Sequence, residues 1–359
     1  MKVVVACGGT GGHAFPGLAV AQELKRRGHD VELWHAGRQA EAGVLSQWDG
    51  ETFSTGAKQL KAKNVFEILR AFFACRRRLK SFRPDILIAM GSYSSLPPVV
   101  AAWLGGVPVV LHEANTVPGR AVDLLSRFAK VVATSFPETA NYLPHVKTVL
   151  TGVPIRSTIT MGTRFPNIPE KAFVVFVTGG SQGAHRVNEL ASKALVDLQK
   201  ALKQRSADRP LYVIHQTGVK DEADVMAAYA SVALPSRVNA FEREMPSVFA
   251  SADLVIARAG ASTCFELAAC GKPVLFIPLP TALRDHQHEN AQSFVRRQAA
   301  DEVIQNRIEA PGLLRYLLHK YNHPEELVQM GENMKKCAVL GAAKQVADLL
   351  EKEVQPKAS

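Results

Sequence analysis

The sequence lacks the features of disulfide-linked and membrane-spanning proteins. Its five cysteines show no Cys-x-x-Cys spacing, which argues for reduced thiols and against a disulfide framework or a zinc site. Prolines and glycines interrupt the most apolar stretch, residues 96–111, well short of the roughly 20 apolar residues that a spanning helix needs. The apolar start is also too short for a signal peptide. We therefore predict a protein that is made and kept in the cytoplasm.

Motifs for some common phosphate and metal sites are missing as well. No GxxxxGK[ST] sequence is present, which excludes a P-loop, and no Asp-x-Asp occurs. His286 and His288 stand among acidic residues, but a spacing of two on a helix directs them to different faces. We expect no bound catalytic metal. Low-complexity segments and short repeats are also absent.

Acidic residues are too few to balance the basic ones. The chain has 43 Lys and Arg against 33 Asp and Glu, a net charge of +10. This surplus favours an anionic partner, which could be nucleic acid, a phosphorylated substrate or an acidic membrane face. No RNA- or DNA-binding module with interleaved aromatic residues is evident, so we do not expect nucleic acid. At 359 residues the chain has room for two domains, each with a sizeable core.

Two glycine-rich loops, one in each half of the chain, follow directly on apolar strands. Strand 2–6 runs into GGTGGH at residues 8–13, and strand 173–177 runs into TGGSQGA at residues 178–184. Glycines let backbone N–H groups approach a ligand, and the helix that each loop opens adds a partial positive charge. The pair predicts two nucleotide-type domains that face each other across a cleft.

The rest of the chain alternates between strand and helix patterns. Such alternation predicts an α/β protein with parallel, doubly wound sheets, whose ligands bind beyond the carboxyl ends of the strands. Residues 157–171 are the best candidate for a linker, and residues 330–354 read as an amphipathic helical tail. Further strands are expected at residues 31–35, 85–89, 107–111, 130–134, 211–215, 236–239, 254–256 and 273–277.

The first loop nearly fits the dinucleotide pattern GxGxxA, with Gly9, Gly11 and Ala14 in place. That interpretation also needs an acidic residue at the end of the second strand, where Trp34 stands, so a nicotinamide or flavin cofactor is disfavoured. His13 follows the glycines. It is either a capping or loop histidine or a general base with a pKa near neutrality.

Two further segments allow both a structural and a functional interpretation. Ser181 could cradle a diphosphate or cap a helix, and these roles are compatible. In segment 258–266, Glu266 could bind both hydroxyls of a ribose, or it could form a capping box with Thr263. The spacing alone does not decide between the two.

Residues 61–83 combine an apolar group with many basic residues. A basic amphipathic helix can lie on an anionic membrane surface, although a core-facing helix with a solvated basic face is the commoner case. The apolar members are Ile68, Leu69, Phe72 and Phe73, and the basic members include Arg70, Arg76, Arg77, Arg78 and Lys80.

Five of these motifs occur together in an order that is typical of one family. They are GGTGGH with FPGLAVAQEL at residues 8–24, HEAN at 112–115, GVPIR at 152–156, GGSQGA at 179–184 and RAGASTCFE at 258–266. Over nearly its whole length the chain resembles the MurG family of peptidoglycan glycosyltransferases.

The resemblance implies a GT-B fold, with two Rossmann-like domains. Residues 1–156 would form the acceptor and membrane-side domain, to which a last helix at about 335–359 crosses back, and residues 157–334 would bind UDP-GlcNAc. The expected reaction moves GlcNAc from UDP-GlcNAc to the C4 hydroxyl of MurNAc in lipid I and gives lipid II for peptidoglycan synthesis. It would invert the anomeric centre without a covalent intermediate, a cofactor or a metal.

The same resemblance implies a peripheral enzyme on the cytoplasmic face of the bacterial inner membrane. The segment 61–83 would dock on the anionic leaflet, and cell-wall and division proteins would be further partners. Three alternatives remain open: a GT-B transferase that glycosylates another lipid such as diacylglycerol, a UDP-GlcNAc epimerase, and a non-catalytic UDP-sugar sensor.

The family motifs also imply roles for individual residues. His13 would be the catalytic base, and Arg156 or Arg258 would join the helix N-termini in stabilising the leaving group. Glu242 stands where the backbone meets the uracil. The residues expected to bind UDP-GlcNAc are Thr10, Gly11, Gly12 and Asn115 at the sugar, Arg156 and Ser181 near the diphosphate, Glu242 at the base, Ala261, Ser262, Thr263, Cys264, Phe265 and Glu266 along the diphosphate and ribose, and Gln287 at the sugar.

Overall fold

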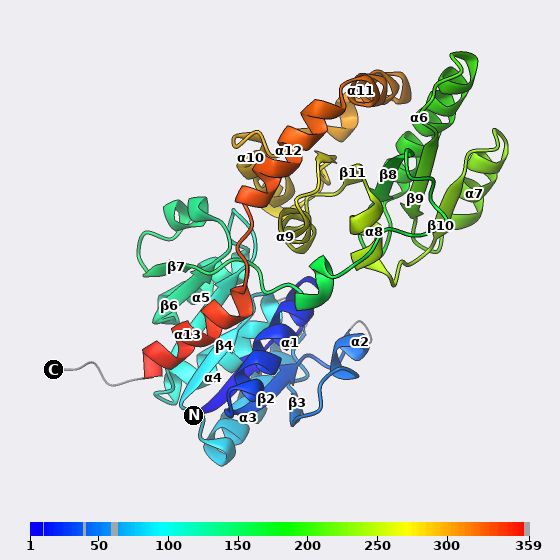
Figure 1. Cartoon of the computed structure of the whole chain (residues 1–359). Helices are drawn as coiled ribbons and strands as arrows, with labels where there is room; N and C mark the ends of the chain where they lie inside the picture. Colours follow the sequence, from blue (N-terminus) through cyan, green and yellow to red (C-terminus); the bar gives the residue numbers. More distant parts are fainter. Residues whose placement is uncertain (10, 39–40, 59–63, 355–359) are drawn as a thin grey trace. The chain divides into compact units, whose positions relative to one another are not determined.

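The computed structural model describes residues 1–9, 11–38, 41–58 and 64–354, and the chain divides into two compact units (Figure 1). Unit 1 comprises Met1–Arg156 and Val339–Ser359, and unit 2 comprises Ser157–Ala338. Each unit is built on one parallel sheet with helices on both faces. The described part of the chain contains no helix with the length and apolar character needed to cross a bilayer.

The sheet of unit 1 has seven parallel strands in the order β3-β2-β1-β4-β5-β6-β7. Its strands are β1 (Lys2–Ala6), β2 (Asp30–His35), β3 (Thr52–Ser54), β4 (Ile86–Ala89), β5 (Val109–Glu113), β6 (Val131–Thr134) and β7 (Thr148–Leu150). Its helices are α1 (Gly11–Arg26), α2 (Ala42–Leu45), α3 (Val65–Phe82), α4 (Leu96–Leu104), α5 (Arg120–Leu125) and α13 (Ala342–Val354), with 3₁₀ turns η3 (Tyr93–Ser95), η4 (Ser126–Phe128) and η5 (Pro137–Tyr142).

The sheet of unit 2 has six parallel strands in the order β10-β9-β8-β11-β12-β13. Its strands are β8 (Phe173–Thr178), β9 (Leu211–Gln216), β10 (Ser236–Asn239), β11 (Leu254–Ala257), β12 (Val274–Phe276) and β13 (Asp301–Glu302). Its helices are α6 (His185–Gln204), α7 (Glu222–Ala230), α8 (Met245–Ser251), α9 (Ala261–Cys270), α10 (His286–Val295), α11 (Ala310–Asn322) and α12 (Pro324–Lys336), with 3₁₀ turns η6 (Ser157–Thr160), η7 (Leu283–Asp285) and η8 (Gln305–Arg307).

The predicted parallel, doubly wound sheets are confirmed, whereas three edge strands were missed. β3, β7 and β13 are two or three residues long and only partly buried, so they carry no apolar run for a sequence pattern to detect. The tail predicted to be helical over 330–354 is helical except for one interruption. It divides into α12 and α13 around residues 337–341, where Gly341 has a φ of +69°.

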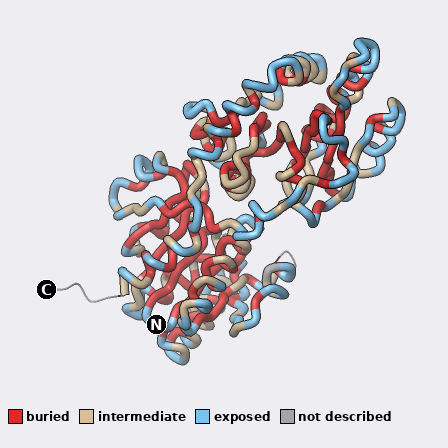
Figure 2. The backbone as a smooth tube through the Cα atoms, viewed as in Figure 1, coloured by how far each residue is buried: buried red, intermediate tan, exposed pale blue. Residues whose placement is uncertain are grey.

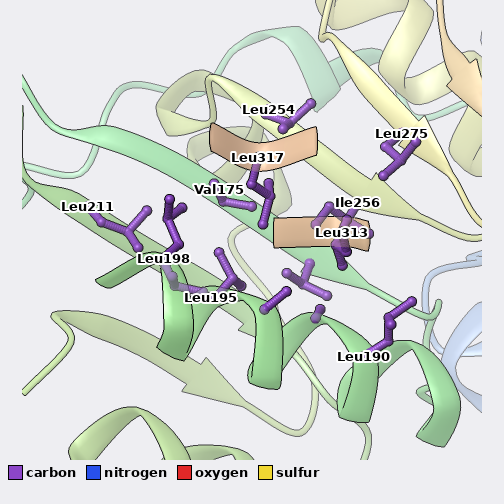
Figure 3. Packing of buried hydrophobic residues seen from close by; sticks show 14 of the residues in the cluster. Val175, Leu190, Leu195, Leu198, Leu211, Leu254, Ile256, Leu275, Leu313 and Leu317 are labelled. Carbon is purple, nitrogen blue, oxygen red and sulfur yellow. The ribbon is translucent and has the colours of Figure 1, made fainter. Parts of the chain in front are cut away.

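The central strands are buried on both faces because helices cover both sides of each sheet (Figure 2). In unit 2, alternate residues of β8, β9 and β11 meet the leucines of α6 and α11 on one face (Figure 3). In unit 1, Val346 and Leu350 of α13 complete the core beside α1. Glu351 of α13 forms an ion pair with Arg27 and a hydrogen bond with His29, so α13 is anchored in unit 1.

Candidate functional site

In each unit, the residues singled out from the sequence gather where neighbouring parallel strands end. In unit 1 the loops after β1, β4 and β5 are adjacent, because β4 pairs with both β1 and β5. In unit 2 the loops after β8 and β11 are adjacent, since Ala257 is in register with Thr178. The predicted residues therefore form two groups, one per unit. Thr10 lies outside the described residues.

His13 lies inside the first turn of α1 rather than capping it. Its Nδ1 is 2.8 Å from the carbonyl oxygen of Met90, which follows β4. Because a carbonyl can only accept, Nδ1 carries the proton, and a neutral ring then has its basic lone pair on Nε2. The neighbouring loop is close, since a Cβ on Gly91 would be 3.5 Å from the His13 Cε1. The histidine is half-buried and its tautomer is set, as a general base requires.

The first glycine loop is packed between its neighbours in the fold. A Cβ on Gly8 would come within 2.8 Å of the Ala36 nitrogen, and one on Gly9 within 2.5 Å of the Ser92 Oγ. The loop is also bonded on both sides: Ser94 Oγ donates to the Gly8 carbonyl (2.6 Å), and the Gly9 N–H donates to Glu41 (2.6 Å). These two glycines are therefore required by the packing of the protein itself.

The HEAN segment ends β5 with a buried polar network. Glu113 accepts hydrogen bonds from the backbone N–H groups of Asn115 and Gly119, each at 2.9 Å, and from the Asn115 side chain. Burial nevertheless raises the pKa of Glu113. Next to it, burial lowers the pKa of His112 to about 4, so this ring is neutral and bonds the Gly152 carbonyl. These bonds to Glu113 hold Asn115 at the carboxyl end of β5.

Arg156 is the last residue of the first segment of unit 1 and is exposed. Its guanidinium lies over the ring of Phe15 on α1, 5.2 Å from the centroid. This contact places a positive charge beside the first glycine loop and its helix.

Ser181 is exposed in the second glycine loop. Its interpretation as a helix cap is wrong, because Ala184 is the N-cap residue of α6. Gly180, at a φ of +87°, donates its N–H to the neutral hydroxyl of Thr178 (3.0 Å). The loop therefore holds its shape through uncharged partners and presents Ser181 and Gln182 at the surface.

Gln216, the last residue of β9, is a buried residue that sequence reasoning missed. Its side-chain amide donates to the Thr178 hydroxyl (3.2 Å) and to the Gly180 carbonyl (2.9 Å). Its side-chain oxygen accepts the Glu242 N–H (3.0 Å). It thus joins the second glycine loop to the Glu242 segment. The available signal was a polar residue at the carboxyl end of an otherwise apolar strand.

Helix α9 begins with an N-cap that has no side chain, Gly260, so its first turn carries no side-chain cap. The capping box between Thr263 and Glu266 is wrong, since Thr263 is already the third residue of the helix. Ser262, Thr263 and Glu266 are partly exposed. By contrast, Ala261, Cys264 and Phe265 are buried, which leaves them only their backbone groups for a ligand.

Arg258 does not fit its predicted role beside a diphosphate. Its guanidinium donates to the carbonyls of Ile277 and Pro278 (2.8 and 2.9 Å) and to the Gln305 side chain (2.6 Å). Burial lowers its pKa to about 10. Arg258 therefore stabilises the loop after β12 through its buried guanidinium.

Glu242 is buried, and its carboxylate pairs with Arg237 at 2.9 Å. It also accepts hydrogen bonds from Asn239 and from the Glu244 N–H. The neighbouring Phe241 is 55% exposed, and the Ala240 carbonyl before it accepts the Gly218 N–H. At this strand end the side chain that faces outward is therefore the phenylalanine, which sequence reasoning also missed.

Gln287 lies in the first turn of α10, and its Oε1 accepts the Leu279 N–H (3.0 Å). This bond fixes the loop after β12. The adjacent histidines have different partners, as their spacing predicted: His286 bonds the Leu283 carbonyl, and His288 bonds Glu302. No group of three or more possible metal-binding side chains occurs among the residues that the structure describes.

Helix α3 buries one face and exposes another. Ala71, Cys75 and Leu79 face the core, whereas Phe66, Leu69 and Phe73 are exposed, Phe66 at 78%. The remaining predicted members are arranged differently. Of the apolar members, Ile68 and Phe72 are half-buried, and Phe72 packs on the core. Of the basic members, Arg76 is half-buried, whereas Arg77 and Lys80 are exposed. Arg78 is half-buried and pairs with the buried Glu32, so its charge already has a partner within the protein. Residues 61–63 lie outside the described part.

Comparison with known proteins gives one consistent result. The glycosyltransferase family 28 N-terminal domain matches residues 3–134, and the family 28 C-terminal domain matches residues 174–350. Among curated proteins, the chain is similar to two enzymes named UDP-N-acetylglucosamine–N-acetylmuramyl-(pentapeptide) pyrophosphoryl-undecaprenol N-acetylglucosamine transferase. The Geotalea uraniireducens protein is 35% identical, with 98% of both chains covered, and the Geobacter sulfurreducens protein is 36% identical, with 97% of both covered.

Solved structures agree with this result. The crystal structure of Acinetobacter baumannii MurG superposes with a TM-score of 0.80 at 32% identity and covers 98% of this chain and 99% of its own. A Neisseria meningitidis UDP-GlcNAc 2-epimerase bound to UDP-GlcNAc reaches a TM-score of 0.72 at 15% identity, covers 98% and 100%, and shows the fold alone. The predicted GT-B fold of two Rossmann-like domains is confirmed.

Proposed function

The chain belongs to glycosyltransferase family 28, and from this premise we propose that it transfers GlcNAc from UDP-GlcNAc to the C4 hydroxyl of MurNAc in lipid I, giving lipid II for peptidoglycan synthesis. The observation that carries the proposal is the similarity at 35% identity across 98% of both chains to a transferase of that name. The group of residues in unit 2 is suited to binding the donor, and the group in unit 1 is suited to deprotonating the acceptor.

Unit 2 would bind the donor. The first turn of α9 offers backbone N–H groups with no side-chain cap, and the helix dipole adds partial positive charge there. Ser181 lies on the neighbouring strand end, so the diphosphate would sit against both. Glu266 would hold the ribose hydroxyls, and Phe241 would pack on the base above the Glu242 backbone. As the sugar–phosphate bond breaks, the amides of α9 and of the second loop would stabilise the charge on UDP.

Unit 1 would act on the acceptor. The C4 hydroxyl must lose its proton as it attacks the anomeric carbon. With Nδ1–H bonded to Met90, the His13 Nε2 is the nitrogen that would accept this proton. Gly11, Gly12 and Asn115 would contact the donor sugar, and Arg156 would add positive charge near the diphosphate.

A turnover assay tests this function. Purified protein would be incubated with radiolabelled UDP-GlcNAc and a soluble lipid I analogue, with and without chelator. The proposal expects a labelled disaccharide product and stoichiometric UDP. Conversion of UDP-GlcNAc to its 2-epimer would instead favour an epimerase. Transfer to diacylglycerol would favour another lipid glycosyltransferase. Binding without turnover would favour a sensor.

We also propose that α3 docks unit 1 on the anionic cytoplasmic leaflet. The apolar side chains Phe66, Leu69 and Phe73 recur at helical spacing, so they form one exposed stripe. Arg77 and Lys80 continue the exposed face, and α4, which packs against α3, adds the exposed Trp103. Apolar side chains flanked by basic ones bind anionic bilayers through both burial and charge.

Vesicle sedimentation tests the docking surface. We expect Arg77→Glu with Lys80→Glu to reduce binding to phosphatidylglycerol vesicles by about 30-fold or more, given roughly 1 kcal/mol per basic residue near the surface. Phe66→Ser with Phe73→Ser, made separately, should also reduce binding, because it removes apolar surface that the bilayer would bury. The matched control is Lys193→Glu with Lys200→Glu on α6 of unit 2, which makes the same charge change. Equal loss in the control, or no loss in either α3 variant, would place the membrane contact elsewhere.

A further inference from the structure

We propose that the carboxylate of Glu41 is a built-in anion of the first glycine loop. It occupies the Gly9 N–H, which such a loop would otherwise offer to a phosphate. The loop of unit 1 is thereby set to bind sugar hydroxyls and to reject a diphosphate, and Glu41 is a positioning residue for His13. The inference rests on the proposed function, because it assigns the substrate group that this loop accepts.

The contacts of Glu41 resemble those of a bound anion. One carboxylate oxygen accepts the Gly9 N–H at 2.6 Å and lies 3.4 Å from the Ala36 nitrogen, and the other accepts the Arg38 N–H at 2.9 Å. The side chain is 1% exposed. Three N–H donors from two loops therefore converge on one buried carboxylate. Both carboxylate oxygens therefore accept N–H groups, as the oxygens of a bound anion do.

The charge of Glu41 is held by amides rather than by a basic side chain. His35 Nδ1 lies 3.5 Å from the carboxylate, but it accepts the Gly37 N–H, so this nitrogen carries no proton. Nearby, Glu41 helps to raise the pKa of the buried Cys7 thiol to about 12, after the larger effect of burial, so the thiol is neutral. The neutral thiol therefore adds no further charge beside the Glu41 carboxylate.

The second glycine loop differs at the equivalent point. There the Gly180 N–H bonds the uncharged Thr178 hydroxyl, and the side-chain donor on the Gly180 carbonyl is the neutral Gln216. A phosphate beside this loop meets dipoles and no fixed carboxylate among these contacts. A phosphate beside the first loop would meet Glu41, and two anions in one buried site repel each other strongly. Sugar hydroxyls carry no charge and escape this penalty.

Glu41 also connects the loop to the proposed base. It holds Gly9 from the β2 side, while Ser94 holds Gly8 from the β4 side and Met90 holds His13. Without the carboxylate, the loop loses one of these attachments just before the first turn of α1. A displacement of about 1 Å at a reacting group can cost up to about 10² in rate.

The test is chemical rescue of Glu41→Ala, because acetate supplies the atoms that this substitution removes. We expect kcat with the soluble acceptor to fall by about tenfold or more, with KM for UDP-GlcNAc changed less than about threefold. Sodium acetate should restore both kcat and Tm with a saturable dependence. Acetamide, and sodium chloride at equal ionic strength, should not. Inorganic phosphate should compete with acetate, since the vacated amides then accept other anions.

Two further variants keep the proposal falsifiable. Glu32→Ala removes a buried carboxylate of unit 1 that pairs with Arg78, so it should lower Tm while kcat stays near normal and acetate has no effect on kcat. Glu41→Gln keeps the shape without the charge and should lower kcat with no acetate rescue. Full activity of Glu41→Gln, or acetate no better than chloride, would overturn the proposal. If the wild type shows no transfer, the proposed function fails, while rescue of Tm still decides the role of Glu41.

Discussion

The two glycine loops are alike in sequence and in position, yet their amides have different partners. Each follows a buried central strand and leads into a helix. In the first, Gly9 donates to a buried carboxylate, and Gly8 and Gly9 have no room for a Cβ. In the second, Gly180 donates to a hydroxyl, and Ser181 is exposed. The glycine motif therefore sets where the backbone turns. We infer that the partners of the loop amides determine whether the loop binds a charged phosphate or an uncharged sugar hydroxyl.

The largest expected effect is on kcat, and it comes from a residue that follows the first glycine loop. His13→Ala should lower kcat by about 10² or more, because it removes the proton acceptor, while UDP-GlcNAc affinity stays within about twofold. Steady-state kinetics and calorimetric titration measure the two quantities. His145→Ala, in the same unit but bonded to Ser126, is the matched control. A near-normal kcat for His13→Ala would assign the histidine to structure.

In unit 2 we expect a loss of UDP-GlcNAc affinity. Glu266→Ala should weaken UDP-GlcNAc binding by more than tenfold, in line with the roughly 1–3 kcal/mol lost when hydrogen-bond partners of a bound ligand are removed. Calorimetric titration gives the Kd. Glu332→Ala, at an exposed position of α12, should leave the Kd unchanged. If Glu266→Ala binds normally, the ribose is held elsewhere.

A smaller effect tests how the second loop is held. Gln216→Ala removes bonds to Thr178, Gly180 and Glu242, so UDP-GlcNAc affinity should fall by about three- to tenfold together with Tm. Gln199→Ala deletes a buried glutamine of α6 that bonds Ala233, and it should lower Tm alone. Equal affinities in the two variants would show that the loop needs no support from Gln216.

The smallest effect concerns the pH dependence of stability and the buried carboxylate of Glu242. Burial raises the pKa of Glu242, but hydrogen bonds from Arg237, Glu244 and Asn239 outweigh this and hold the pKa below its ordinary value. A lowered pKa stabilises the fold above the unfolded value, about 4.3, and the contribution is lost as pH falls through the folded pKa. Glu242→Gln should therefore lower Tm at pH 7, and the difference should shrink below about pH 4. A pH-independent difference would mean that the charge is not involved.

The sequence predicts the sheets because their central strands are apolar runs bounded by turns. β1 and β10 are found at the predicted bounds, and the other predicted strands all lie within two residues of theirs. The short edge strands escape detection, because two or three half-buried residues show no periodicity. At the candidate sites, motif spacing located both loops and α9. It did not predict the roles of Glu41, Gln216 or Arg258, because those depend on hydrogen bonds between segments far apart in the chain.

We infer that the second glycine loop binds the diphosphate and that the first does not. A crystal structure with UDP-GlcNAc tests this inference most directly. We expect the diphosphate to lie within hydrogen-bond distance of Ser181 and the first turn of α9, with the Glu41 carboxylate still on the Gly9 N–H. A diphosphate bound at residues 8–13, with Glu41 displaced from Gly9, would contradict the account.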